Sequence, residues 1–384
     1  MRIVQLTTDG RELLRDYSSP TPALGTAPQA LLEGFATRSD LEVHVLSCLQ
    51  RPVKSPSKLG ENIWFHTLHV PKLGWLRTGY QGCVRAVRRK VRDLRPDVVH
   101  GQGTERDCAL SAVWSGFPNV VTLHGNMSEM ARTFRTRVGS FAWCAAILEH
   151  YALKRTRGVF CNSTFTHELV RRRAGKTWLV PNAVREGFFS TPPRVRSATK
   201  PVLLNVGVIC ENKRQQELIE IADRLHAGGL KFELRFLGHA DPNDAYAKRF
   251  LDSVADAART NYLSFQGLKL DRELIGAYDD ALALVHFPKV ETFGLVVAEA
   301  LCRGLKIFAA RTGGLRDILD GVDSAEHFEP GDFTGLEVAI ANWLKAGAPP
   351  AGESARSVMR ERYHPAVIAR RHIEIYCEVL GSCS

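Results

Sequence analysis

The sequence predicts an α/β protein built from two doubly wound, Rossmann-like domains. Its 384 residues are too many for one ordinary hydrophobic core. Short apolar runs alternate with helical patterns along the whole chain, and a polar, proline-rich stretch, Ser190–Pro201, divides the pattern in two. Buried strands that alternate with helices are typical of parallel sheets covered by helices on both faces.

The first half contains six strand-like runs and four helical patterns. The strands are expected at residues 2–8, 42–47, 97–100, 119–124, 158–162 and 178–182. The helices are expected at residues 28–37, 82–94, 141–154 and 166–173. We therefore assign residues 1–185 to an N-terminal domain.

The second half repeats this alternation. Strands are expected at residues 202–207, 233–238, 263–267, 281–287 and 306–310, and helices at residues 214–225, 245–258 and 293–302. We assign residues 186–364 to a C-terminal domain. Two such domains are expected to face each other across a central cleft, where the carboxyl ends of both sheets hold the functional residues.

Composition and charge narrow the classes of function. The net charge of +10 is concentrated in residues 1–184, with 26 Lys and Arg against 14 Asp and Glu. The helical segment Arg85–Arg92 places its basic residues beside a valine stripe, as either a solvated outer face or a docking surface for anionic lipid. Nucleic acid is not expected as a partner, because no aromatic residues interleave with these charges.

The cysteines and the apolar runs indicate the compartment. Nine cysteines are scattered without a C-x-x-C pair, which is typical of reduced thiols in a cytoplasm. The apolar run at the N-terminus is too short for a signal peptide, and no stretch reads as a membrane span. We expect a cytoplasmic protein, with peripheral association at the inner face of a membrane if the basic segment docks there.

The segment "KVETFGLVVAEALCRG" places Glu291 and Glu299 on either side of an apolar helix. One interpretation is helix capping plus a structural ion pair; the other is a site for a ligand rich in hydroxyls. Further motifs follow one another along the chain: "ALGTAPQ", "RPDVVH", "VTLHG", "LVPNAV", "NVGVICENKRQQ", "LRFLG", "FQG" and "ALCRGLKIFAARTGGLRDIL". Through this ordered set, the sequence resembles the family 4 retaining glycosyltransferases of the GT-B fold over nearly its whole length.

The resemblance implies a donor site in the second domain. Glu291 would accept hydrogen bonds from the donor sugar, and Glu299 from the ribose hydroxyls of the nucleotide. Backbone N–H groups at Phe293, Gly294 and Leu295, at the start of the expected helix, would face phosphate or sugar oxygens. Lys213 would hold the diphosphate, although a surface lysine before a helix is the plainer interpretation.

In the first domain, the resemblance points to His124, Gly25 and Thr26. His124 closes a buried strand and would contact the transferred sugar, whereas a purely structural histidine is the alternative from the residues alone. A backbone amide near Gly25 and Thr26 would meet the diphosphate. The family also implies that the last helix, residues 365–384, crosses back onto the first domain.

The sequence departs from the family pattern at three positions. Val208 stands where an arginine usually follows the strand glycine, and we name Arg214 as the nearest substitute. Thr26 replaces the second glycine of the usual pair. Pro288 stands three residues before Glu291, one fewer than is typical.

We therefore expect a retaining glycosyltransferase that moves a sugar from a nucleotide-diphosphate donor to an acceptor hydroxyl. The acceptor would be a saccharide or lipid-linked sugar in surface polysaccharide or glycolipid assembly. No Asp-x-Asp occurs, so we expect neither a cofactor nor a required metal. A non-catalytic protein of the same fold that binds a nucleotide or partner, and a nucleotide-sugar epimerase, are the alternatives.

Overall fold

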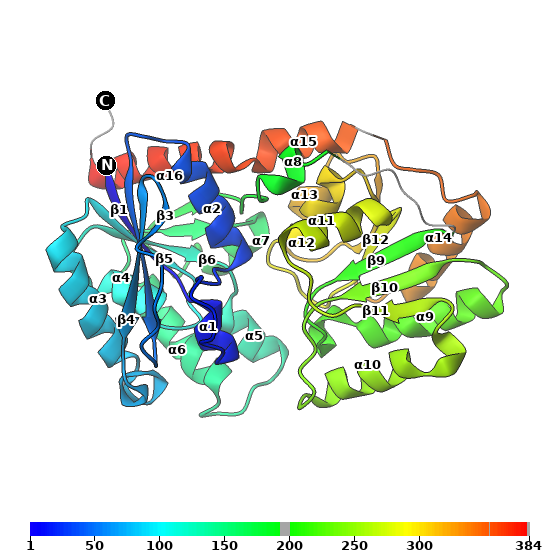
Figure 1. Ribbon diagram of the computed structural model, residues 1–384, viewed down its shortest axis with the longest axis horizontal. Helices are drawn as coiled ribbons and strands as arrows, with labels where there is room; N and C mark the ends of the chain where they lie inside the picture. The colour runs from blue at the N-terminus through cyan, green and yellow to red at the C-terminus, as the bar shows by residue number, and fades with distance from the viewer. Residues whose placement is uncertain (193–199, 353, 382–384) are drawn as a thin grey trace. The chain divides into compact units, whose positions relative to one another are not determined.

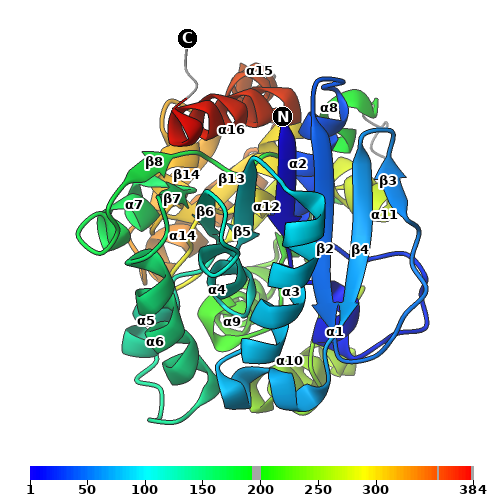
Figure 2. The same cartoon turned by 90° about the vertical axis from the view of Figure 1, so that its left-hand side faces the viewer.

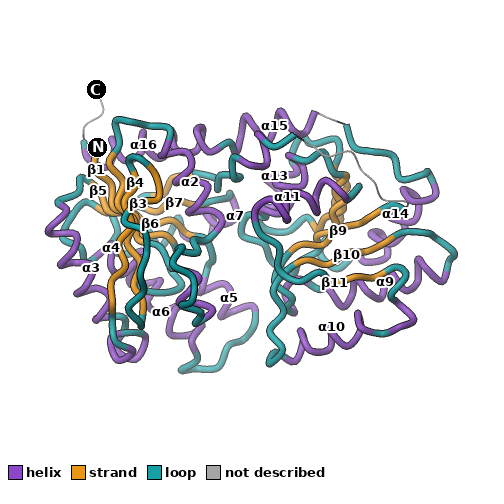
Figure 3. The backbone as a smooth tube through the Cα atoms, viewed as in Figure 1, coloured by secondary structure: helices purple, strands orange, loops and turns teal. Residues whose placement is uncertain are grey.

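The computed structural model describes residues 1–192, 200–352 and 354–381, and the chain divides into two compact units. The first unit contains Met1–Arg185 and Tyr363–Ser384, and the second contains Glu186–Arg362. Each unit has a sheet with helices on both faces (Figures 1 and 3), which confirms the predicted fold class. The division precedes the expected linker Ser190–Pro201, of which residues 193–199 lie outside the described part of the chain.

Over its described residues, the first unit contains a sheet of eight strands in the order β3-β4-β2-β1-β5-β6-β7-β8. All neighbours pair in parallel except β3 and β4, which are antiparallel. The strands are β1 (Arg2–Leu6), β2 (Glu42–Leu49), β3 (Lys58–Gly60), β4 (Ile63–His69), β5 (Val98–Gln102), β6 (Asn119–Leu123), β7 (Val159–Cys161) and β8 (Thr177–Leu179). Sequence analysis missed β3 and β4.

The helices of the first unit are α1 (Gly10–Leu14), α2 (Thr26–Ala36), α3 (Gln81–Leu94), α4 (Cys108–Val113), α5 (Met127–Thr133), α6 (Phe141–Leu153), α7 (Thr164–Val170) and α16 (Pro365–Leu380). Helices α2 and α16 pack on one face of the sheet, whereas α3, α4 and α6 pack on the other (Figure 2). Successive side chains of β1 pack on opposite faces of the sheet: Ile3 faces α2 and α16, and Val4 faces α3.

The second unit has a fully parallel sheet in the order β11-β10-β9-β12-β13-β14. Its strands are β9 (Val202–Val206), β10 (Glu233–Leu237), β11 (Leu263–Phe265), β12 (Ala283–His286), β13 (Lys306–Ala310) and β14 (Ala325–Phe328). Its helices are α8 (Gly187–Ser190), α9 (Gln215–Ala227), α10 (Ala245–Ala255), α11 (Asp271–Asp280), α12 (Leu295–Cys302), α13 (Leu315–Leu319), α14 (Phe333–Lys345) and α15 (Ser354–Tyr363).

Two helices begin later than the sequence predicts, and the backbone explains both. Helix α12 begins at Leu295 rather than Phe293 because Gly294 has φ +103° and cannot be helical. Helix α9 begins at Gln215 because Arg214 lies in the left-handed region at φ +57°. Over the described ranges, no helix combines the length and the apolar character that a membrane span requires.

Helix α16 joins the first sheet through a buried polar and aromatic cluster. The Tyr376 hydroxyl lies 2.6 Å from Nδ1 of His100 and accepts a hydrogen bond from Gln5 at 3.0 Å. His372 stacks on Phe160 at a centroid distance of 4.8 Å, and its Nδ1 contacts the Ile368 carbonyl. Burial lowers the pKa of His372 from 6.5 to about 4, so the ring is neutral at pH 7.

The free energy of unfolding is expected to fall as the pH is lowered from 7 to 5. Between pH 6.5 and 4 the unfolded chain binds a proton that His372 does not bind when folded, so this stability is lost with acid. One such histidine removes about 2 kcal/mol by pH 5. His372→Gln should flatten the pH dependence in urea titrations, whereas the exposed His150→Gln should not. Equal slopes for both variants would contradict this account.

Candidate functional site

At the carboxyl edge of the second sheet, two side chains meet the carboxylate of Glu291. Lys213 follows β9 and places its Nζ 2.5 Å from Oε2 of Glu291. His286, the last residue of β12, places its Nε2 3.1 Å from the same oxygen. Both partners of Glu291 are largely shielded, with His286 1% and Lys213 20% exposed, so their interaction with Glu291 is weakly screened.

The protonation of this cluster follows from its burial and its charges. Burial alone would raise the pKa of Glu291, but the Lys213 cation and the His286 hydrogen bond together hold it well below its usual range. Burial and the neighbouring Lys213 lower the pKa of His286, although Glu291 opposes them. At neutral pH Glu291 is therefore a carboxylate and His286 a neutral imidazole.

Backbone contacts fix the loop that carries Glu291. The Asn212 side chain donates to the Val290 carbonyl (3.0 Å) and accepts from the Val290 N–H (3.1 Å). The Lys289 N–H donates to the Asn212 carbonyl at 2.8 Å. The loop after β9 and the loop after β12 are thus joined next to the Lys213–Glu291 pair, which limits the freedom of both side chains.

Two glycines complete this loop for steric reasons. The Gly314 N–H donates to the Glu291 carbonyl at 2.9 Å, and a Cβ on Gly313 would lie 1.9 Å from that carbonyl oxygen. Gly294 has φ +103°, and its Cβ would meet Leu315 at 2.3 Å. The Gly-Gly turn at residues 313–314 therefore packs against the backbone of Glu291 in a way that a larger residue would prevent.

Gly313→Ala is expected to weaken nucleotide binding and to lower the unfolding free energy by about 1–3 kcal/mol. The new methyl group must displace the Glu291 backbone, and the residue keeps a positive φ of +53°. Urea unfolding and nucleotide titration measure the two effects. Gly347→Ala, with φ +83° and nothing within 4 Å, is the control for backbone strain alone. Similar ligand affinities for the two variants would argue against the packing role of the turn.

Glu299 lies within α12 and is only 2% exposed. Its Oε2 accepts a hydrogen bond from the Tyr278 hydroxyl at 3.1 Å, and the same hydroxyl contacts the Val296 carbonyl. Of the predicted amide positions, Phe293 is buried and Leu295 is the first helical residue. The role of Glu299 toward a ribose stays a prediction, and Tyr278 is a partner that sequence analysis missed.

Arg214 does not join the Glu291 cluster. Its guanidinium lies 5.3 Å from the Phe333 ring centroid, at the start of α14. Its Nη1 is buried without a hydrogen-bond partner among the described residues. Val208 is 54% exposed, and its carbonyl accepts from Gln215. The apolar side chain at this position therefore contributes no cation to the site.

In the first unit, His124 follows β6 and ends a chain of buried amides. Its Nε2 donates to Gln102 Oε1 at 2.8 Å, Gln102 donates to Gln5 at 2.7 Å, and Gln5 donates to Tyr376. Burial lowers the pKa of His124 to about 4, although a hydrogen bond to Asn182 opposes this. His124 is thus a neutral, Nε2-protonated ring at pH 7.

The loop after His124 is held by the buried carboxylate of Glu149, on α6. This carboxylate accepts hydrogen bonds from the Met127 N–H (2.8 Å), the Ser128 hydroxyl (2.8 Å) and Thr104 (2.9 Å). Arg173 pairs with it at 3.2 Å. Sequence analysis missed Glu149, since nothing in the sequence brings it next to residues 104 and 127.

Gly25 and Thr26 form the exposed start of α2. Gly25 is its N-cap, and a Cβ there would make only ordinary contact with Pro28, so a glycine is not sterically required. The preceding loop is fixed by the buried pair Asp9–Arg11, whose arginine also donates to the Ser19 and Pro20 carbonyls. The structure thus supports an ordered loop at the position the sequence predicts.

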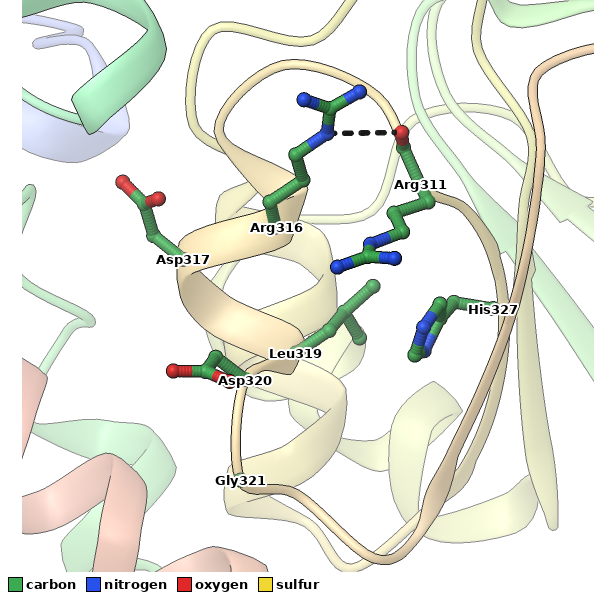
Figure 4. A pocket seen from close by; sticks show the side chains of 7 residues that line it. All are labelled: Arg311, Arg316, Asp317, Leu319, Asp320, Gly321 and His327. Atoms are coloured by element: carbon green, nitrogen blue, oxygen red, sulfur yellow. Dashed lines mark hydrogen bonds between the residues drawn. The ribbon is translucent and has the colours of Figure 1, made fainter.

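A separate pocket of about 320 Å³ lies between α13 and β14 in the second unit. Arg311, Arg316, Asp317 and His327 line it, and Arg316 donates to the Arg311 carbonyl at 3.3 Å (Figure 4). It contains charges of both signs, and none of the predicted site residues lines it. We assign it no role in the site around Glu291.

Solved structures show where else this fold occurs. A sucrose-phosphate synthase from Thermosynechococcus elongatus superimposes with a TM-score of 0.77 at 18% identity, and the match covers all of both chains. HepE from Anabaena, in complex with UDP-glucose, superimposes with a TM-score of 0.72, also at 18% identity and over all of both chains. Two parallel α/β units of this kind define the GT-B class of fold.

Family models assign the chain within that class. The model of Glycosyltransferase Family 4 matches residues 29–187, and that of Glycosyl transferases group 1 matches residues 191–362. The chain belongs to these glycosyltransferase families. The sulfoquinovosyl transferase SQD2 of Arabidopsis thaliana is 31% identical over 152 residues. That match covers 38% of this chain but only 28% of SQD2.

Proposed function

We propose that the protein transfers a sugar from a nucleotide-diphosphate donor to an acceptor hydroxyl with retention of anomeric configuration. The second unit binds the donor, and the first binds the acceptor. Membership of the glycosyltransferase families supports the reaction class. The observation that carries the proposal is the Lys213–Glu291 pair at the carboxyl edge of the second sheet, where such folds hold their ligands.

The chemistry of the pair suits a diphosphate leaving group. When the donor enters, Lys213 exchanges part of its contact with Glu291 for a diphosphate oxygen, and Glu291 accepts a sugar hydroxyl. The acceptor hydroxyl attacks the anomeric carbon from the face that the diphosphate leaves, so the new bond keeps the configuration. The departing phosphate oxygen takes the acceptor proton. Because the Nε2–H of neutral His124 is donated to Gln102, the residue meets the sugar through its Nδ1 acceptor or its backbone carbonyl, and it is not the base.

Uridine diphosphate is the donor nucleotide to test first, because HepE of similar fold was solved with UDP-glucose. Calorimetric titration with UDP, GDP, ADP, TDP and CDP, without added metal, compares the five bases. Binding of one nucleotide that is weakened by Glu299→Ala but little by Tyr278→Phe would support the ribose contact. The second variant keeps the carboxylate and removes the Tyr278 hydroxyl, which donates to Glu299 and contacts the Val296 carbonyl.

The outcomes separate the proposal from its rivals. Binding without transfer to any acceptor would favour a non-catalytic nucleotide-binding protein, for which the exposed Val208 is the supporting observation. Conversion of the donor sugar in the absence of an acceptor would favour an epimerase. Failure of all five nucleotides to bind would contradict the proposed donor site.

We also propose that the acceptor is presented at an anionic membrane surface through α3. This helix buries Val84, Val87 and Val91, while Arg85, Arg88, Arg89 and Arg92 are exposed. A basic face of this kind binds anionic lipid electrostatically. Binding to phosphatidylglycerol vesicles should decrease with salt and with the fourfold Arg→Gln variant. Binding that is indifferent to both would contradict this proposal.

A further inference from the structure

Three metal-ligating side chains meet inside the first unit, apart from the residues discussed for transfer. Cys48 lies near the end of β2, Cys83 in the first turn of α3, and Asp107 directly before α4. One ligand atom from each lies within 4.8 Å of the other two. Helix α3 packs against both β2 and α4 (Figure 2), which explains why residues so distant in sequence converge.

We propose that Cys48, Cys83 and Asp107 bind one divalent metal ion of the zinc class, which stabilises the first unit. Two sulfur ligands and one carboxylate oxygen suit a borderline-soft ion such as Zn²⁺. In a tetrahedral site, Zn–S bonds of about 2.3 Å place the ligand atoms roughly 3.5–3.8 Å apart. The ligand atoms lie within 4.8 Å of one another, so at most small side-chain movements are needed to reach this geometry.

The surroundings of Asp107 favour a cation at this place. Asp107 is only 6% exposed, yet its carboxylate makes no capping hydrogen bond to α4. It accepts hydrogen bonds from its own backbone N–H and from the Cys48 thiol, and Arg106 interacts with it electrostatically, but no Lys or Arg of the described residues forms a salt bridge with it. Carboxylates are rarely buried without a cation or a metal, because removing their charge from water is costly.

The two thiols are equally shielded. Cys48 is 6% and Cys83 0% exposed, and both belong to the apolar cluster between the sheet and α3. An ion shielded from solvent in this way would have a structural role if a fourth ligand completes its tetrahedron. Cys108 is buried in the same cluster, but it lies outside the group of three and contacts the Thr8 hydroxyl at 3.8 Å, so it would have to move to serve as the fourth ligand in place of water.

Cobalt titration of the full chain tests the proposal. The reduced protein, freed of metal by a chelator, is titrated with Co²⁺ alone. We expect near-ultraviolet absorption from thiolate-to-cobalt charge transfer that saturates at one equivalent and is abolished by Zn²⁺. Cys48→Ala and Cys83→Ala should each lose or halve this absorption, whereas Cys161→Ala, at a buried thiol outside the cluster, should retain it. A loss with Cys108→Ala as well would assign the fourth ligand.

Asp107→Asn keeps the shape of the site and both thiols, and it should weaken Co²⁺ binding by about tenfold or more. Zn²⁺ should raise the Tm of the wild type and not that of Cys83→Ala, since an ion that binds only the folded state stabilises it. Absence of the charge-transfer absorption, or its persistence in both cysteine variants, would overturn the proposal. These readouts do not depend on sugar transfer.

Discussion

Lys213→Ala is expected to lower kcat/KM for sugar transfer by about 100- to 1,000-fold, the usual loss when one preorganised charge at a developing anion is removed. In the structure the ammonium group is already oriented by Glu291 at 2.5 Å, so it needs little rearrangement to meet a diphosphate. The variant also leaves Glu291 with His286 as its remaining side-chain partner among the described residues, which adds to the disturbance.

The neighbouring Lys289 supplies a matched control for Lys213. It forms an ion pair with Glu211, and these side chains are 30% and 65% exposed. Lys289→Ala removes a charge of the same kind two residues before Glu291, but it should change kcat/KM by less than about threefold. A double-mutant cycle between Lys213→Ala and Glu291→Gln should show strong non-additivity, because the two groups act as a pair. Equal effects of the two lysine variants would contradict the site.

Asp279→Ala is expected to cost about 3–5 kcal/mol of unfolding free energy. The carboxylate forms a bidentate pair with Arg303 at 2.8 and 2.9 Å, and both side chains are almost completely buried. Arg303 also donates to the Phe188 and Thr191 carbonyls, so it joins α11, the end of α12 and the segment after α8. Without Asp279 the guanidinium charge is buried and uncompensated.

Urea unfolding measures this loss, and Glu273→Ala on the same helix is the control. Glu273 pairs with Lys269 at 3.9 Å and is 70% exposed, so its removal should cost less than about 1 kcal/mol. If Asp279→Ala were as mild as Glu273→Ala, the buried pair would not be a main contributor to the stability of the second unit.

Alternating strand and helix patterns allowed the fold class to be predicted from the sequence, whereas the short strands β3 and β4 and the helices α11, α14 and α15 were missed. Apolar runs such as residues 202–206 mark strands buried on both faces. In β4 the apolar run ends after three residues at His66 and Thr67, and β3 has only three residues, so neither produces such a run. The helix boundaries at Gly294 and Arg214 depend on backbone dihedral angles, which composition does not encode locally.

Only part of the candidate site could likewise be predicted from the sequence. Lys213 and Glu291 stand in recognisable motifs, and the structure brings them into contact. His286, Tyr278 and Glu149 were missed because a lone histidine, tyrosine or glutamate in an apolar segment resembles any other core residue. Their roles arise from contacts between segments that are distant along the chain, which only the tertiary structure shows.

The return of α16 to the first unit has a consequence for the order of events during synthesis. The ribosome releases residues 186–362 before it releases α16. Until then, the face of the first sheet that α16 covers lacks Ile368, Ala369, Ile375 and Tyr376, and the close contact of Gly34 with Pro365 cannot form. The first unit to be translated is therefore the last to complete its core, and its nascent form exposes apolar surface of the kind that chaperones bind.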